Sequence, residues 1–391
     1  NVTSFKNMFN GCEVFESDLS SWLTGVNSAK ILSGMFAGCS KFNADVKDWN
    51  VAGVLEMASL FYNCKNFNRD VSKWTVGNVT DVSQMFEGCG TFNCNLSGWE
   101  VSKVTNMSGM FASCTAFDQD LSAWSDKVRN VTNFSRMFGG CINFKGTGLD
   151  NWKVFNGTNF NSTFLNCKEF VASLKDWNIE NATSAKNMFN GALKFNGDVS
   201  KWRPVNLEDA SGMFSTCRAF NRDLSSWSTP RLRDMSYMFN SCDIFNSDLS
   251  KWDVSNVEKF TGTFCWAKSF NKDLSEWNVG RVVDMGDMLY GCYAFNSDLS
   301  RWNVAQVANM DQLFYNCWAF NADISKWNVA RVTTMNRMFY GCKIFNANLS
   351  RWDVSNVEDM GFMFWGCEAF NADLSLWNVG KVASIGGMFV R

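Results

Sequence analysis

The chain has 391 residues, and its 46% apolar content is enough to bury a large core. Lys and Arg number 36 against 38 Asp and Glu, so no basic surface points to nucleic acid or to an anionic membrane as a partner. The absence of histidine removes the usual general base near neutral pH and the commonest metal ligand, and no apolar run reaches the roughly 18 residues of a membrane span.

One unit of about 25 residues repeats along the whole chain, with a Trp as its marker. The interval between markers is 25 residues except for 27 after Trp22 and 28 after Trp124, which places insertions near 23–34 and 125–151. Three tryptophans lie outside this spacing: Trp266, Trp318 and Trp365. A period of this length predicts a solenoid of stacked rungs, and we expect any site private to one rung within 124–152.

Each unit predicts a short strand followed by a short helix. In "LSKWNV" large and polar residues alternate around the Trp, which is typical of a strand. The next apolar residues follow a three-to-four spacing, as in Val332, Met335, Met338 and Phe339, which predicts a helix of two to three turns. The expected fold class is therefore an α/β solenoid of about 15–16 stacked rungs, leucine-rich-repeat-like.

The Trp column is the expected centre of the core. A unit this small cannot bury its own apolar face, so stacked copies must share one core. The Phe that follows each unit's Cys is usually followed by Asn, and we interpret these amides as structural, bonding buried turns of neighbouring rungs. The tryptophans that we expect to be buried in this core include Trp252, Trp277, Trp302, Trp327 and Trp352.

The register continues unbroken through both prolines of the chain. Pro204 and Pro230 follow the repeat Trp in consecutive units, where they predict a local bend and not a domain boundary. Residues 1–391 are therefore expected to form a single continuous solenoid. The chain starts and ends within a unit, which leads us to expect a fragment of a longer protein or a part of a polymer.

The repeats resemble a known family. "FNSDLSKWDVSNVEKF" and "FNANLSRWDVSNVEDMGFMFWGC" are similar to the units of BspA-type leucine-rich-repeat surface proteins, and the similarity extends over essentially all of 1–391. The resemblance implies a cell-surface or extracellular solenoid used for adhesion, with no catalytic activity and no cofactor. Its implied partners are extracellular matrix or cell-surface ligands.

Thirteen of the fifteen cysteines occupy one column of the repeat. One alternative is a row of small buried free thiols, which we favour, and the other is disulfides between neighbouring rungs. Without His or a C-x-x-C pair, zinc patterns are absent. The candidate disulfide cysteines are Cys39, Cys64, Cys89, Cys114, Cys141, Cys167, Cys217, Cys242, Cys292, Cys317, Cys342 and Cys367.

Sequons for N-glycosylation concentrate before residue 182. Turn and cap chemistry such as "SNVT" creates these sequons by accident, and this is the simpler interpretation. If the chain is secreted by a eukaryote, its first half is expected to be glycosylated. The candidate sites are Asn1, Asn78, Asn106, Asn130, Asn156 and Asn181.

An Asp column, which includes Asp248, Asp273 and Asp298, places like charges at rung spacing. Main-chain N–H groups or neighbouring cations are expected to offset them, with calcium between rungs as the alternative. No metal site and no catalytic residue is predicted. Three functions remain open: an adhesive scaffold, a protomer that joins itself end to end in an extracellular filament or sheath, and, least favoured, an enzyme.

Overall fold

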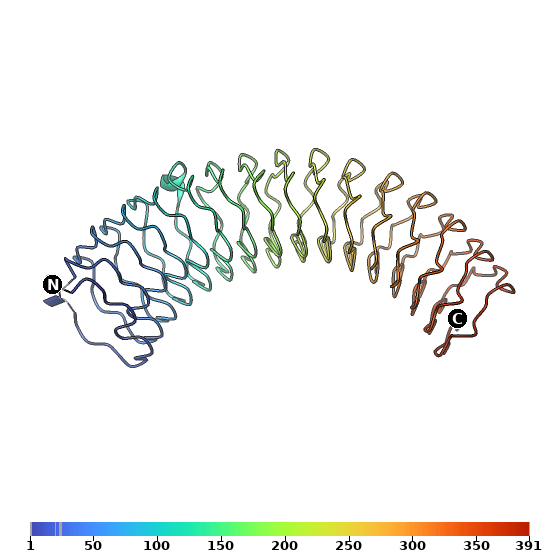
Figure 1. The fold of residues 1–391 in the computed structure, drawn as a ribbon, viewed down its shortest axis with the longest axis horizontal. Helices are drawn as coiled ribbons and strands as arrows, with labels where there is room; N and C mark the ends of the chain where they lie inside the picture. The colour runs from blue at the N-terminus through green and yellow to red at the C-terminus, as the bar shows by residue number, and fades with distance from the viewer. Residues whose placement is uncertain (1, 20, 23–25, 391) are drawn as a thin grey trace. The chain divides into compact units, whose positions relative to one another are not determined.

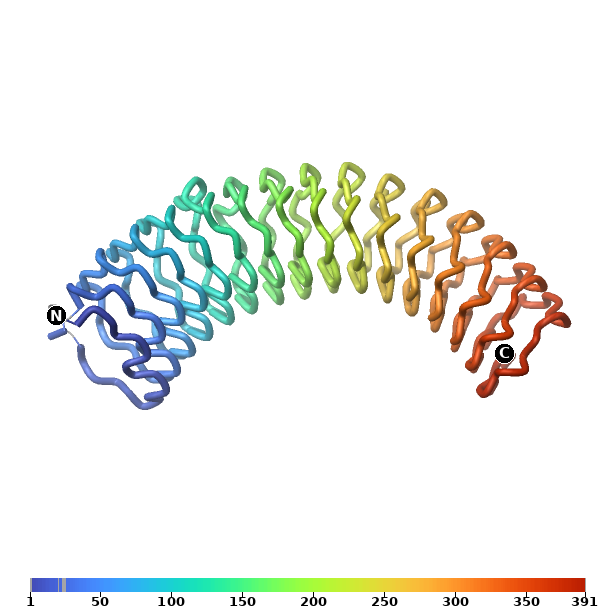
Figure 2. Tube along the Cα trace, in the orientation of Figure 1, coloured from blue at the N-terminus to red at the C-terminus, as the bar shows by residue number. Residues whose placement is uncertain are grey.

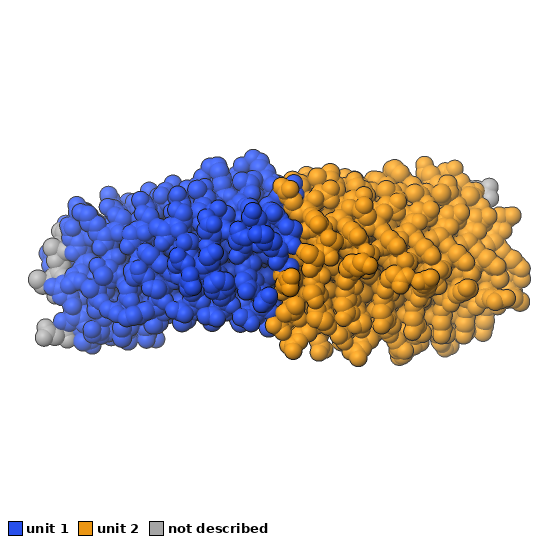
Figure 3. Space-filling view, turned by 90° about the horizontal axis from the view of Figure 1, so that it is seen from above, with its two compact units in different colours: residues 1–202 blue, residues 203–391 orange. Residues whose placement is uncertain are grey.

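The computed structural model describes residues 2–19, 21–22 and 26–390. It contains two compact units, Asn1–Trp202 and Arg203–Arg391, which Figure 3 distinguishes. The division falls directly before Pro204, although the repeat continues in both units. The insertion near 23–34 lies partly outside the described residues, whereas that at 125–151 directly follows the short 3-10 helix η2, Ser122–Trp124.

Within each unit the rungs stack one against the next, as the ribbon and the tube show (Figures 1 and 2). One residue per rung forms a parallel bridge with its equivalent in the next rung, for example Glu56 with Asp81 and Asp284 with Asn309. These residues lie seven positions after the repeat Trp. The strand predicted over "LSKWNV" is wrong: isolated bridges replace continuous strands in the described residues.

The short helix predicted in every rung is also wrong, because the apolar segment is a chain of tight turns. The N–H groups of Met85 and Cys89 donate to the carbonyls three residues before them, at 3.2 and 3.0 Å. The N–H groups that alternate with these point along the stack instead: Gln84 donates to the carbonyl of Ser108 and Phe86 to that of Met110, at 2.8 and 2.9 Å. Successive turns therefore repeat an inward side chain every three to four residues, the spacing that also indicates a helix.

Two positions in each rung require backbone with positive φ. They lie ten and fourteen residues after the repeat Trp and are occupied in one rung by Gln84 and Gly88, with φ of 55° and 77°. Positive φ at the third residue of a four-residue turn is the type II geometry, which favours Gly and Asn. At several such positions a glycine lies beneath the side chain of the preceding rung, so that a Cβ at Gly341 would approach the Asn316 amide oxygen to 2.1 Å.

The core of each unit is a set of side-chain columns that run along the stack. Trp302 and Trp327 stack with ring centroids 6.3 Å apart and an interplanar angle of 2°. The Trp302 indole N–H also donates to the main-chain carbonyl of Leu274, at 2.9 Å. Aromatic contact and hydrogen bonding therefore join consecutive rungs through the same side chain. In the described residues no helix is long and apolar enough to span a bilayer.

Candidate functional site

The five core tryptophans named from the sequence are buried. Their exposed fractions are between 2% and 4%, with Trp252 at the upper end and Trp352 at the lower. Each indole N–H donates to a carbonyl of the preceding rung at 2.9 to 3.1 Å. These residues hold the scaffold together and present no ring face to a ligand.

The cysteine column is a row of free thiols in the structure, and none of the six neighbouring pairs is a disulfide there. The Cys89 thiol donates to the carbonyl of Phe61 in the preceding rung, at 3.0 Å. Burial raises the pKa of Cys39 to about 11 and that of Cys367 to about 12. The same thiol-to-carbonyl bond is made by Cys39, Cys64, Cys114, Cys141, Cys167, Cys242, Cys292, Cys317, Cys342 and Cys367.

A raised pKa keeps these thiols protonated at neutral pH, and the thiolate is the nucleophile and the metal ligand in cysteine chemistry. The column is therefore not arranged as a reactive site. Disulfide formation between neighbouring rungs stays a prediction, which a thiol count tests directly.

The sequon asparagines belong to a structural ladder. Their side-chain N–H groups donate to carbonyls of the preceding rung at 2.8 to 2.9 Å, in Asn78, Asn130, Asn156 and Asn181. Asn256 and Asn356 make the same bond at 2.8 Å without being sequons. This repetition supports turn chemistry as the origin of the sequons, while glycosylation stays a prediction; Asn106 donates to Asp81 at 3.3 Å, and Asn1 lies outside the described residues.

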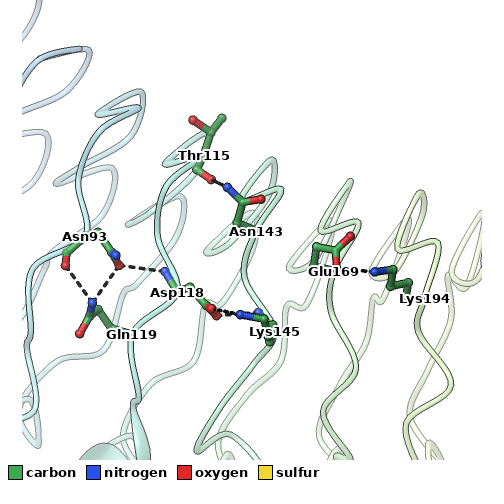
Figure 4. A network of polar contacts seen from close by, with 8 residues as sticks. All are labelled: Asn93, Thr115, Asp118, Gln119, Asn143, Lys145, Glu169 and Lys194. Atoms are coloured by element: carbon green, nitrogen blue, oxygen red, sulfur yellow. Dashed lines mark hydrogen bonds and ion pairs between the residues drawn. The ribbon is translucent and has the colours of Figure 1, made fainter.

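A second polar ladder follows the Phe-Asn column, and Figure 4 shows its course in the first unit. The Asn93 side-chain oxygen accepts the N–H of Asp118 at 3.0 Å, and Asp118 in turn accepts the N–H of Lys145 at 3.0 Å. The Lys145 ammonium pairs with the same Asp118 carboxylate. These residues bridge rungs as expected, but Asn93 and Lys145 are exposed and not buried as the sequence suggested.

The Asp column is offset within its own turns. Asp248 and Asp298 accept the N–H groups of Ser250 and Ser300 at 2.8 Å, and these main-chain and hydroxyl bonds hold both Asp pKa values below their usual range. In the part of the chain that the structure describes, no three His, Cys, Asp or Glu side chains gather as a metal site.

A different set of residues forms the candidate site, on the second unit. The three tryptophans outside the repeat spacing meet four of the six tyrosines of the chain there. They lie thirteen to sixteen positions after the repeat Trp, on consecutive rungs. We name this surface the aromatic strip: Trp266, Tyr290, Tyr293, Tyr315, Trp318, Tyr340 and Trp365.

The rings of the aromatic strip brace one another. Four of them form one continuous stack: Tyr290, Tyr315, Tyr340 and Trp365. The centroids of consecutive rings are 4.3, 4.5 and 4.4 Å apart, with interplanar angles of 10° or less. Trp266 closes one end edge-on, 5.0 Å from Tyr290. Because stacked neighbours cover the ring faces, the stack presents ring edges and phenol groups outward.

A second, shorter stack lies beside the first. Tyr293 and Trp318 are 4.0 Å apart with an interplanar angle of 8°, and Trp318 is 46% exposed. The Lys343 ammonium lies 5.8 Å from the Trp318 ring centroid, a favourable cation–π distance. Burial, followed by the neighbouring Tyr315, raises the pKa of Tyr290 to about 12, so this phenol remains a protonated donor at neutral pH.

This arrangement is suited to binding and not to bond-making chemistry. Tyr and Trp supply large contact areas with few rotatable bonds, and they are enriched among the residues that dominate binding energy. Side chains already held by their neighbours lose little conformational entropy on binding. The available sequence signal was the set of three tryptophans outside the spacing, which we noted without assigning a site.

Comparison with solved structures finds leucine-rich-repeat proteins of low sequence identity. One from Bacteroides ovatus is 14% identical with a TM-score of 0.36, over 86% of this chain and 78% of that one. A leucine-rich cell-surface protein from Faecalibacterium prausnitzii is 13% identical with a TM-score of 0.32, over 78% of this chain and 77% of that one. A protein from Leptospira interrogans is 7% identical with a TM-score of 0.23, over 94% and 98%.

Comparison with curated proteins finds no significant match. One family model, described as "Mycoplasma protein of unknown function, DUF285", matches in five overlapping segments: 1–99, 30–147, 132–248, 223–318 and 294–391. The resemblance to BspA-type leucine-rich-repeat proteins agrees with these tandem matches. The chain belongs to the DUF285 family over its whole length.

Proposed function

We propose that this protein is a non-enzymatic repeat scaffold, on the cell surface or outside the cell, that adheres to matrix or cell-surface proteins through the aromatic strip. The observation that carries the proposal is the clustering of Trp266, Trp318 and Trp365 with tyrosines on one surface of the second unit. The repeat Trp is buried in the core from Trp49 to Trp352, whereas the three tryptophans outside that column are partly exposed and are not needed to fill the core.

One further contact supports protein recognition. Arg337 lies 5.1 Å from the ring of Phe362, which adds an Arg and another exposed aromatic ring to the second unit, and Trp, Tyr and Arg are the residue types enriched at binding hot spots. The location outside the cell rests on the resemblance of the repeats to surface proteins.

The test is binding of the purified chain to immobilised collagen, fibronectin, laminin and mucin, followed by biolayer interferometry. Size-exclusion chromatography beforehand separates self-assembly from ligand binding. We compare the wild type with a double variant of the aromatic strip, Trp318→Ser with Trp365→Ser. The matched control is Val171→Ser with Leu376→Ser, two exposed apolar residues outside the strip.

The wild type and the control are expected to bind at least one of these proteins, and the strip variant to lose at least about tenfold in affinity, which is typical of hot-spot truncation. Circular dichroism confirms that each variant is folded. Absence of binding by the wild type, or equal binding by the strip variant and the control, contradicts the proposal.

A further inference from the structure

A hollow of about 430 Å³ opens on the first unit. Its floor includes Gly34, Ala37 and Gly38, which have little or no side chain. At residue 34 a φ of 65° favours glycine, and an added Cβ would come within 2.1 Å of the Asn7 amide oxygen unless that side chain moved.

Amides and hydroxyls surround this floor. Asn7, Ser59, Tyr62 and Gln84 line the hollow, and no Lys, Arg, Asp or Glu is among its lining residues. The Ser59 hydroxyl donates to the Gln84 amide oxygen at 3.2 Å, so this bond does not use the Gln84 NH₂ group. The Tyr62 phenol, on the same rung as Ser59, adds a further hydroxyl and an apolar ring.

The lining decides the class of ligand. A charged ligand entering an uncharged hollow gives up hydration without gaining an ionic partner, which is unfavourable. A purely apolar ligand leaves the amides and hydroxyls without partners, which is also unfavourable. A ligand that carries both donors and acceptors on a compact ring satisfies the lining, and the volume lies within the range of small-ligand sites.

We propose that this hollow binds one ring of a neutral saccharide, with Gln84 and Tyr62 as its principal hydrogen-bonding residues. Sugar hydroxyls both donate and accept, which matches an amide and a phenol side by side. The C–H groups of the sugar ring supply the apolar surface that Tyr62 contacts. This site is separate from the aromatic strip and does not depend on the function proposed for it.

The test is saturation-transfer difference NMR on the full chain, with the methyl glycosides of glucose, galactose, mannose and N-acetylglucosamine at millimolar concentration. N-acetylglycinamide is the additional probe, because a peptide group also carries one donor and one acceptor. At least one glycoside is expected to receive magnetisation from the wild type, and titration of that signal gives its dissociation constant.

Gln84→Gly and Tyr62→Phe are each expected to weaken this binding about fivefold, as the loss of one neutral hydrogen bond does. Gly is used at residue 84 because glycine occupies the equivalent position in the next rung, at Gly109, and two rungs before, at Gly34, so the fold tolerates it. The matched controls are Gln312→Gly, in the same column as Gln84, and Tyr237→Phe, an exposed tyrosine of the second unit outside the aromatic strip, and both are expected to bind like the wild type.

Tyr62→Phe keeps the ring and removes only the hydroxyl, so it remains informative if Gln84→Gly folds poorly. Three results overturn the proposal: no transfer to any glycoside, glycoside binding that both variants leave unchanged, or transfer to N-acetylglycinamide alone.

Discussion

The tryptophan in each repeat has two roles in the stack. Its ring fills the core beside the Trp of the next rung, and its indole N–H donates to a carbonyl of the preceding rung, as for Trp302 and Leu274. Loss of this hydrogen bond would leave both the buried indole N–H and the carbonyl without a partner, which is unfavourable. The column therefore sets both the spacing and the register of neighbouring rungs.

Replacing Trp302 with Ala is expected to lower the free energy of unfolding by about 3–5 kcal/mol, the usual cost of removing a large buried aromatic side chain. Trp318→Ala is the matched control, since Trp318 is in the same rung but 46% exposed, against 3% for Trp302. Urea unfolding measures both. Equal losses in the two variants would mean that the Trp column is not the core.

The cysteines of the buried column are expected to be unreactive until the protein unfolds. Under native conditions a thiol reagent at pH ~8 should modify Cys12, the exposed member of the column, much faster than its buried members, because burial raises their pKa values and suppresses the thiolate. In denaturant without reductant, free thiols predict modification of all fifteen cysteines. A count lower by an even number would instead support the disulfides between rungs.

Burial of these thiols also makes stability depend on pH. Burial raises the pKa of Cys342 well above its usual value in the folded protein, whereas the unfolded chain releases the proton above pH ~8.5. The unfolded state then binds fewer protons than the folded state, so the free energy of unfolding falls as the pH rises.

Between pH ~8.5 and pH ~9.5, one such thiol accounts for a loss of about 1 kcal/mol. The wild type is therefore expected to lose that much more stability over this interval than Cys342→Ala, in urea titrations with reductant present. Alanine already occupies this column at Ala192 and Ala267, so the fold tolerates it. Parallel pH profiles for the two proteins would show that Cys342 is not buried as a thiol.

At the scale of the element, each rung is a series of turns whose N–H groups alternate between the turn and the next rung. Val82, Met85, Phe86 and Cys89 all face the core, at the three-to-four spacing of an amphipathic helix. Apolar spacing alone could not distinguish a series of turns from a helix, because both structures return a side chain to one face at the same interval. Glycine and asparagine, which predominate at the second positive-φ position, were the distinguishing signal.

Replacing Gly88 with Ala tests this geometry. Gly88 has a φ of 77°, which costs a non-glycine residue roughly 1–2 kcal/mol, and its new Cβ would approach the Asn63 amide oxygen to 2.1 Å. Gly77→Ala is the control, because the added Cβ there meets the Glu100 side chain no closer than 3.6 Å and no positive φ is required. A segment that is helical in solution would reverse the order of the two variants, since alanine stabilises helices.

At the scale of the whole molecule, the sequence was sufficient to predict a repeat solenoid with buried tryptophans and to resemble the right class of repeat protein. The first compact unit ends at Trp202 and the second begins at Arg203, next to Pro204, for which the sequence predicts a local bend. The sequence led us to expect a binding site confined to one rung within 124–152. The aromatic strip instead lies on rungs without insertions, between Trp266 and Trp365.

The strip could not be derived from the repeat because its residues occupy columns that vary from rung to rung. Only a structure shows that positions fourteen and sixteen residues after the repeat Trp lie beside one another on successive rungs. Residues that differ from the repeat consensus are therefore the ones to map first in proteins of this kind.

The central claim, that the aromatic strip is the binding surface, is tested most directly by hydroxyl-radical footprinting with mass spectrometry. The wild type is oxidised alone and in complex with whichever immobilised matrix protein or mucin it binds. Oxidation of Trp318 and Trp365 is expected to fall markedly in the complex, while that of Phe155, an exposed aromatic residue of the first unit, stays unchanged. Full oxidation of both tryptophans in the complex, with protection confined to other residues, would contradict the claim.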